Sequence, residues 1–116
     1  MTRLMMNYNF GDVVMMPFPF IDSPIKKLRP ALVLSNNPDG EHDKHLVMAM
    51  ITSAKRSHWS SDIVLKGWQT AGLNAPSIVR WKIFTIEAAL VHNKRGMLCK
   101  EDLSAVKTGL KGIMTI

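Results

Sequence analysis

Four prolines between residues 17 and 30 constrain this chain more than any other feature. They fall within the fourteen-residue stretch PFPFIDSPIKKLRP. Because proline has no backbone N–H to donate, this stretch fits neither a helix nor a central strand, and we expect a loop. The valine-rich segment Asp12–Phe18, which follows Gly11, favours a strand before that loop. Ala31–Ser35 is expected to form a second strand after it, ended by the turn sequence NNPDG at residues 36–40.

Further short apolar segments follow, separated by turn residues. Leu46–Thr52 is apolar until its last residue, which is typical of a strand buried on both faces. The remaining strands expected are Asp62–Leu65, Ser77–Lys82, Phe84–Ile86 and Leu90–His92. Trp68 and Trp81 are interpreted as packing residues.

The apolar period changes near the C-terminus. Apolar residues recur there every three to four positions, at Leu103, Val106, Leu110 and Ile113. This spacing predicts a helix over Lys100–Met114, with acidic residues in its first turn where the helix dipole favours them. The pattern as a whole predicts a mainly β fold, a small barrel of short strands capped by one C-terminal α-helix.

Length and composition exclude several classes of protein. A chain of 116 residues supports one core, so a single domain over residues 1–116 is expected. No run approaches the roughly 18 apolar residues that a membrane span needs. Asn7 and Asn9 interrupt the apolar N-terminus, so no signal peptide is expected. The single cysteine, Cys99, excludes an internal disulfide and suits a reducing cytoplasm.

The charge balance indicates an anionic partner. Fifteen Lys and Arg residues against nine Asp and Glu residues give a formal net charge of +6. A basic surface attracts phosphates because binding releases condensed counterions, and it also suits an acidic protein. The four histidines and Cys99 show no metal-binding spacing, and no glycine-rich phosphate loop is present. No metal and no cofactor are therefore expected.

Five segments of the chain occur in an order that resembles a known family. They are GDVVMMPFPF (11–20), RPALVLSN (29–36), LVMAMITS (46–53), the segment 61–87 containing AGLNAPSIV and IFTIE, and RGMLCKEDLSAV (95–106). Together they resemble the MazF/PemK family of toxin endoribonucleases. The resemblance implies an SH3-like barrel, a homodimer, a cognate antitoxin, and metal-independent, sequence-selective cleavage of single-stranded RNA or mRNA.

The resemblance also implies site residues. An Arg at the mouth of the second strand and a Thr at the end of the third touch RNA in that family, and here they correspond to Arg29 and Thr52. A guanidinium holds a phosphate through two parallel hydrogen bonds, and a hydroxyl both donates and accepts. Without the family pattern, Arg29 is interpreted as a solvated loop charge and Thr52 as a turn-capping residue. Arg80 is a third catalytic candidate, and its alternative is a strand residue facing solvent.

Residues next to these candidates suggest a track for the RNA backbone. Basic residues lie in the loops before Arg29 and after Thr52, and Trp59 is available to stack on a base. The alternative is a solvated charge run and a tryptophan packed on the barrel rim. The candidate RNA-binding residues are Lys26, Lys27, Ser53, Lys55, Arg56, His58, Trp59 and Lys82.

Lys82 departs from the family pattern. Some members carry a carboxylate two residues after the Arg that corresponds to Arg80, and this carboxylate acts as a base. A lysine accepts a proton only if its pKa is strongly depressed. The chain therefore either follows the branch of the family that relies on the Arg and Thr, or has its base elsewhere, or cleaves weakly. His58 is the substitute base favoured by intrinsic pKa, and its alternative is an exposed loop histidine. The departure also supports an alternative function, a weak or inactive relative that binds RNA through a basic groove. A third possibility is a protein-directed toxin that resembles the gyrase-poisoning branch of the same superfold. That branch binds its target through residues of the C-terminal helix, and the C-terminal sequence GLKGIMTI of this chain offers no evident equivalent of them.

Overall fold

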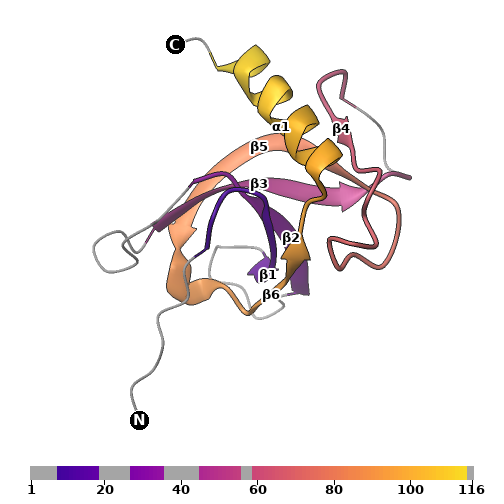
Figure 1. The fold of residues 1–116 in the computed structure, drawn as a ribbon. Coiled ribbons are helices and arrows are strands. Elements are labelled where there is room, and N and C mark those ends of the chain that lie inside the picture. The colour runs from indigo at the N-terminus through magenta and orange to yellow at the C-terminus, as the bar shows by residue number, and fades with distance from the viewer. Residues whose placement is uncertain (1–7, 19–26, 36–44, 56–58, 115–116) are drawn as a thin grey trace.

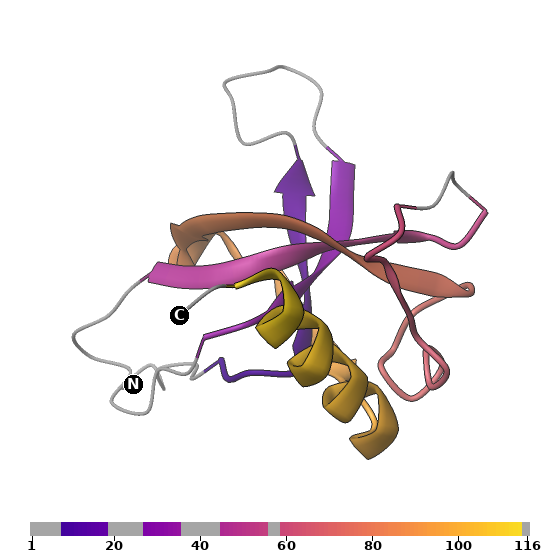
Figure 2. The same ribbon diagram turned by 90° about the horizontal axis from the view of Figure 1, so that it is seen from above.

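The computed structural model describes residues 8–18, 27–35, 45–55 and 59–114. Within them the elements are β1 (Asp12–Phe18), β2 (Lys27–Val33), β3 (His45–Ser53), β4 (Ile63–Val64), β5 (Ser77–Glu87), the 3-10 helix η1 (Ala88–Leu90), β6 (Asn93–Met97) and α1 (Lys100–Ile113). The strands form one antiparallel sheet in the order β4-β5-β3-β2-β1-β6. The sheet curls into a half-barrel, and α1 lies across one side of it (Figures 1 and 2). The expected mainly β fold with a C-terminal helix is confirmed.

Alternate residues of the central strands pack into two cores on opposite faces of the sheet. Val13 and Leu32 belong to the core under α1, whereas their neighbours Val14 and Ala31 belong to the other core. This alternation follows from the two-residue period of a strand, and each large apolar side chain buried in this way stabilises the fold by about 1.5–3 kcal/mol. Trp68 and Trp81 pack against the first core, which confirms their interpretation as packing residues.

The second strand begins earlier than expected. Residues 27–30 were assigned to the proline-rich loop, but β2 starts at Lys27 and pairs with β1 from there. Pro30 fits in the strand because β2 pairs with β3 only from Ala31 onward, so the other edge of β2 lies open at the proline. The loop predicted from the prolines was therefore wrong for these four residues, because the prolines alone do not show which strand edge is paired. The family segment RPALVLSN had placed Arg29 and Pro30 in the second strand.

The later strands also differ from the prediction. Ser77–Lys82 and Phe84–Ile86 are parts of one continuous strand, β5, which contains a bulge. Leu90–His92 was expected to form a strand, but the strand at this point is the polar segment Asn93–Met97. This segment pairs with the free edge of β1 through its backbone, and an edge strand needs no apolar side chains for that.

The helix α1 is anchored to the segment before β5 by a buried carboxylate. The Asp102 side chain is buried and accepts hydrogen bonds from the backbone N–H groups of Lys66, at 3.0 Å, and Gly67, at 2.8 Å. Cys99 occupies the N-cap position, and a Cβ on Gly67 would lie 2.8 Å from the Cys99 sulfur. Glu101 and Asp102 stand in the first turn, as the dipole argument predicts. No helix of the described part of the chain is long and apolar enough to cross a membrane.

Candidate functional site

Arg29 lies at an open edge of the sheet. It precedes Pro30, which restricts its backbone to an extended conformation, and it pairs with Met16 of β1. On the other side, pairing between β2 and β3 begins only at Ala31 and Met50. The Arg29 side chain is exposed and forms no ion pair with any residue that the structure describes. Its guanidinium is therefore available to a ligand.

Thr52 stands at the end of β3 and is half-buried. The turn that follows is capped by its neighbour, because Ser53 Oγ accepts a hydrogen bond from the N–H of Lys55 at 3.2 Å. In the described part of this turn the capping hydroxyl therefore belongs to Ser53. Within the described ranges, the Thr52 hydroxyl has no hydrogen-bond partner.

The two residues face one another across a gap between β2 and β3. Continuing the register of these strands two residues past Ala31 and Met50 places Arg29 opposite Thr52, on the same face of the sheet. One cavity of about 380 Å³ is lined by both residues together with Phe18, Lys27, Pro30, Met50 and Ile51. A second cavity of about 290 Å³ is also lined by both, with further residues of β2, β3 and the segment before β5. Four residues are common to both walls, and of these only Arg29 and Thr52 carry polar side chains.

The walls of both cavities are electropositive. Lys27 and Arg29 line the first cavity, and Arg29 and Arg95 line the second. Among the described residues, no Asp or Glu lines either cavity. Such a surface is suited to phosphates, since a guanidinium holds two phosphate oxygens at once.

Residues 9–114 match the family model of the PemK-like, MazF-like toxins of type II toxin–antitoxin systems. The chain belongs to this family. No curated protein shows significant similarity to the sequence.

Solved structures share this toxin fold. The chain aligns with the Mycobacterium tuberculosis toxin MazF-mt6 at 21% identity and a TM-score of 0.66, covering 88% of this chain and 93% of that one. It aligns with MazE–MazF from Deinococcus radiodurans at 15% identity and a TM-score of 0.70, covering 93% and 95%. An endoribonuclease in complex with its cognate antitoxin, from a mycobacterial species, aligns at 15% identity and a TM-score of 0.69, covering 90% of each chain. At these identities the likeness establishes the MazF fold.

Arg80 lies apart from the two cavities of this MazF-like sheet. It stands opposite Met50 on β5 and is only 8% exposed, so the alternative of a solvent-facing strand residue is wrong. The Asp62 carboxylate accepts hydrogen bonds from Nε of Arg80 at 3.2 Å and from Nη2 of Arg80 at 2.9 Å. The hydrogen bonds to Asp62 raise the pKa of the Arg80 guanidinium. The carboxylate that pairs with Arg80 thus comes from the turn before β4.

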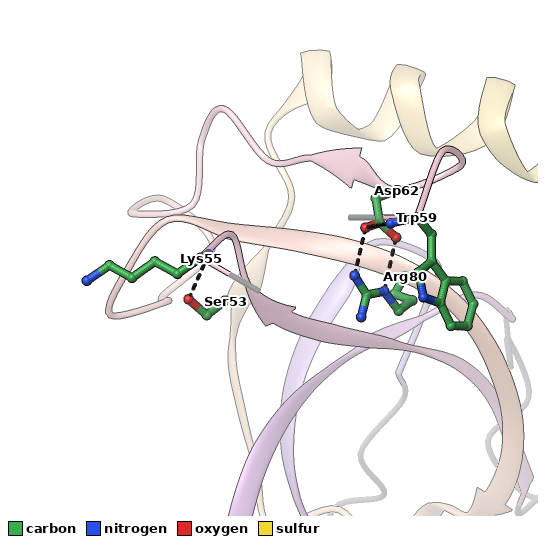
Figure 3. Close-up of polar contacts among 5 residues, drawn as sticks. All are labelled: Ser53, Lys55, Trp59, Asp62 and Arg80. Carbon is green, nitrogen blue, oxygen red and sulfur yellow. Dashed lines mark hydrogen bonds and ion pairs between the residues drawn. The ribbon is translucent and has the colours of Figure 1, made fainter. Parts of the chain in front are cut away.

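Trp59 covers this ion pair. Its ring centroid lies 4.9 Å from Cζ of Arg80 and 5.4 Å from Nζ of Lys82, within the range of cation–π contacts. Figure 3 shows the ring beside the Arg80–Asp62 pair, apart from the turn that carries Ser53 and Lys55. Trp59 is 44% exposed, so it is not packed into the core.

The other predicted RNA-binding residues divide into two groups. Lys27 and Ser53 line the cavities, and Lys55 is exposed on the turn directly after β3. Lys26, Arg56 and His58 lie outside the described residues, so the predicted base His58 is not placed. Among the described residues, no group of three or more His, Cys, Asp or Glu side chains could hold a metal ion.

Sequence reasoning missed Arg95, which lines the second cavity. It is the extra residue at a bulge of β6, between the pairs Val14–Lys94 and Val13–Gly96. Arg95 Nε donates a hydrogen bond to the carbonyl of Gly72 at 3.2 Å. Gly72 itself has a φ of +79°, a backbone conformation suited to glycine. A bulge that redirects a side chain leaves no periodic pattern in the sequence, so periodicity could not identify Arg95. The one sequence signal was that Arg95 precedes a glycine in the family segment RGMLCKEDLSAV.

Proposed function

We propose that this chain is the toxin of a type II toxin–antitoxin pair and acts as a sequence-selective endoribonuclease on single-stranded RNA, mRNA included. The observation that carries the proposal is the opposition of Arg29 and Thr52 across the electropositive gap between β2 and β3. Family membership and the endoribonuclease and MazF neighbours support it. The proposal takes in residues 1–116 as a single toxin domain.

The proposed reaction is a transesterification within the RNA. The 2′-oxygen loses its proton to water and attacks the adjacent phosphorus, and the bond from phosphorus to the 5′-oxygen breaks. The released 5′-oxygen takes up a proton from water, so that a 2′,3′-cyclic phosphate and a 5′-hydroxyl remain. Extra negative charge develops on the phosphoryl oxygens in the transition state, and Arg29 holds these oxygens through two N–H groups. The Thr52 hydroxyl accepts a hydrogen bond from the attacking 2′-OH and donates one to the phosphate.

The positive charge in this scheme comes from the guanidinium, so the proposal includes no metal and no cofactor. Lys27 and Lys55 extend the charge on either side of the gap, where they contact the phosphates of flanking nucleotides. Ser53, next to Thr52 on the wall of the second cavity, contributes a further hydroxyl to the RNA.

The proposed partners follow from the same charge. A cognate antitoxin with an acidic segment would cover the basic cavities, as electrostatic complementarity favours. Solved structures of related toxins include MazE–MazF complexes. We also propose a homodimer, and a cytoplasmic location, where mRNA is found.

The proposal is tested by incubating purified protein with a long unstructured RNA in EDTA and mapping the fragment ends. Discrete cuts are expected for the wild type and for Lys111→Ala, whose exposed lysine lies at the far end of α1. Arg29→Ala should lose about 10²- to 10³-fold in rate, and Arg29→Lys should recover only part, because an ammonium holds phosphate through one point.

Circular dichroism confirms that each variant is folded. If RNA stays intact with a folded wild type, endonuclease activity is wrong. Salt-sensitive RNA binding without cuts would then favour the alternative, a relative that binds RNA through its basic groove and for which Lys82 replaces the carboxylate of other members.

A further inference from the structure

The turn from Trp59 to Asp62 holds the Trp59 ring in place. Trp59 donates its backbone N–H to Oδ2 of Asp62 at 2.8 Å, and Asp62 donates its N–H back to the carbonyl of Trp59 at 3.0 Å. This reciprocal pair closes the turn and fixes the direction in which the tryptophan side chain leaves the backbone.

The same carboxylate fixes the surface beneath the ring. Asp62 and Arg80 have side chains only 3% and 9% exposed, and two hydrogen bonds join them. The guanidinium is therefore held beneath the indole, 4.9 Å from its centroid. A planar cation clamped by a buried carboxylate gives the aromatic ring a rigid support, so little conformational entropy is lost when a ligand stacks on it.

The ring remains open to a ligand. Trp59 is 44% exposed, although a large aromatic side chain gains free energy by burial. Lys82 stands beside it, exposed, with its ammonium 5.4 Å from the centroid. Among the described residues, Asp62 neutralises Arg80, so Lys82 leaves a net positive charge at the ring. An exposed aromatic face next to a cation is the combination that binds a nucleobase and its phosphate.

A bulge in β5 brings Lys82 to this position. Ala49 pairs with Ile83 and Met50 pairs with Arg80, so Trp81 and Lys82 are extra residues on β5. Trp81 packs into the core under α1, and Lys82 is exposed. Bulges change the direction of side chains and often occur beside binding sites.

The ring also lies in line with the proposed cleavage site. Arg80 stands opposite Met50, so the two side chains share a sheet face, and Thr52 is on that face two residues further along β3. Strand spacing and rise place the Cα atoms of Arg80 and Thr52 roughly 8 Å apart. An RNA strand bound at Arg29 and Thr52 therefore reaches Trp59 within a short distance.

We propose that Trp59 is a stacking platform for a nucleobase flanking the scissile phosphate, with Lys82 on the phosphate of that nucleotide and with Arg80 and Asp62 as positioning residues. The platform proposal rests on the proposed function, because that function supplies the RNA that would stack on Trp59. It also changes the role expected of Arg80, which supports the platform and does not contact the reacting atoms.

The first test is RNA binding, measured by fluorescence anisotropy with a labelled unstructured single-stranded RNA. Trp59→Ala should weaken binding about 10- to 100-fold, the range expected for the loss of one stacked base, and Trp59→Phe should retain most of it. Val64→Ala is the matched control, since Val64 is 60% exposed on the neighbouring strand β4 and should bind like the wild type. Equal affinities of Trp59→Ala and the wild type would overturn the platform.

A second experiment identifies a base as the ligand. Single abasic residues are introduced at successive positions of an RNA that the wild type binds. One position should lower the affinity of the wild type and leave that of Trp59→Ala unchanged. A Trp59→Ala protein that binds RNA normally but loses affinity for an acidic antitoxin peptide would instead assign the ring to the protein partner and overturn the proposal.

The positioning role is tested through coupling. Arg80→Lys keeps a charge beside Asp62 but removes the planar support, so it should raise KM and leave kcat unchanged. The double variant with Trp59→Ala should bind RNA no more weakly than Trp59→Ala alone. Additive losses, or a fall in kcat, would contradict this role. Trp59-dependent binding by a protein that makes no cuts would leave the platform standing and remove only the proposed cleavage.

Discussion

Arg29 of β2 and Thr52 of β3 lie opposite one another, two residues beyond Ala31 and Met50, where the pairing between these two strands stops. Both residues line the two cavities at the gap between β2 and β3. β3 remains paired to β5 at Thr52, so the threonine is held by the sheet, whereas Arg29 is held through β1. A ligand in the gap therefore meets two side chains carried on regular backbone, which is a rigid arrangement for a reaction site.

The Thr52 hydroxyl is expected to matter more than the shape of the side chain. Thr52→Ser keeps the hydroxyl and should stay within about 10-fold of the wild-type rate, whereas the isosteric Thr52→Val should lose about 10²- to 10³-fold, as for the removal of a transition-state hydrogen bond. Single-turnover cleavage of a short RNA measures both. Equal rates for the valine and serine variants would exclude the hydroxyl from the chemistry.

Lys27 and Lys55 are expected to contact phosphates without taking part in the bond rearrangement. Each alanine substitution should lower the slope of log Kd against log salt by about 0.7, the value for one phosphate contact on a single strand. RNA affinity measured over a series of salt concentrations gives the slope. Lys111→Ala is the control at the far end of α1. An unchanged slope in either lysine variant would place that lysine off the RNA track.

Asp102 is expected to be essential for stability. In Asp102→Asn, one backbone N–H of the Lys66–Gly67 pair faces an amide NH₂ in place of a carboxylate oxygen, and a buried donor without a partner costs about 1–3 kcal/mol. Urea unfolding measures the loss. Glu101→Gln removes an exposed ion pair with Lys66, which solvent screens, and should lower the free energy of unfolding much less than Asp102→Asn does. Similar effects of the two substitutions would show that Asp102 does not anchor the helix.

The two glycines of α1 should respond differently to alanine. A Cβ on Gly112 meets nothing within 4 Å, so Gly112→Ala should stabilise the protein by about 0.5–1 kcal/mol through helix propensity. A Cβ on Gly109 would lie 2.9 Å from Ile63 and 3.1 Å from the Trp81 ring, and such overpacking costs about 1–3 kcal/mol. Thermal unfolding of both variants should therefore rank Gly112→Ala as the more stable. The reverse order would mean that β4 and Trp81 yield to the added methyl group.

Local features of the chain were predictable where neighbouring residues along the sequence decide the outcome. The strand Asp12–Phe18 was predicted with its observed bounds, and α1 begins at the predicted Lys100 and ends one residue before the predicted Met114. Both depend on periodicity and turn residues, which act over a few positions. The division of β5 into two strands was wrong because a bulge interrupts the period without ending the strand.

The order of the family segments, by itself, determined the fold class and singled out Arg29 and Thr52, because both lie at recognisable strand ends. Only the tertiary structure placed them opposite one another, opened the cavities and brought Arg95 to their wall. It also gave Arg80 its carboxylate from Asp62, eighteen residues earlier in the chain, and laid Trp59 over the pair. The physical reason is that ion pairs and cavities depend on which strands become neighbours and where their pairing stops, and these are long-range relations that no local pattern of residues records.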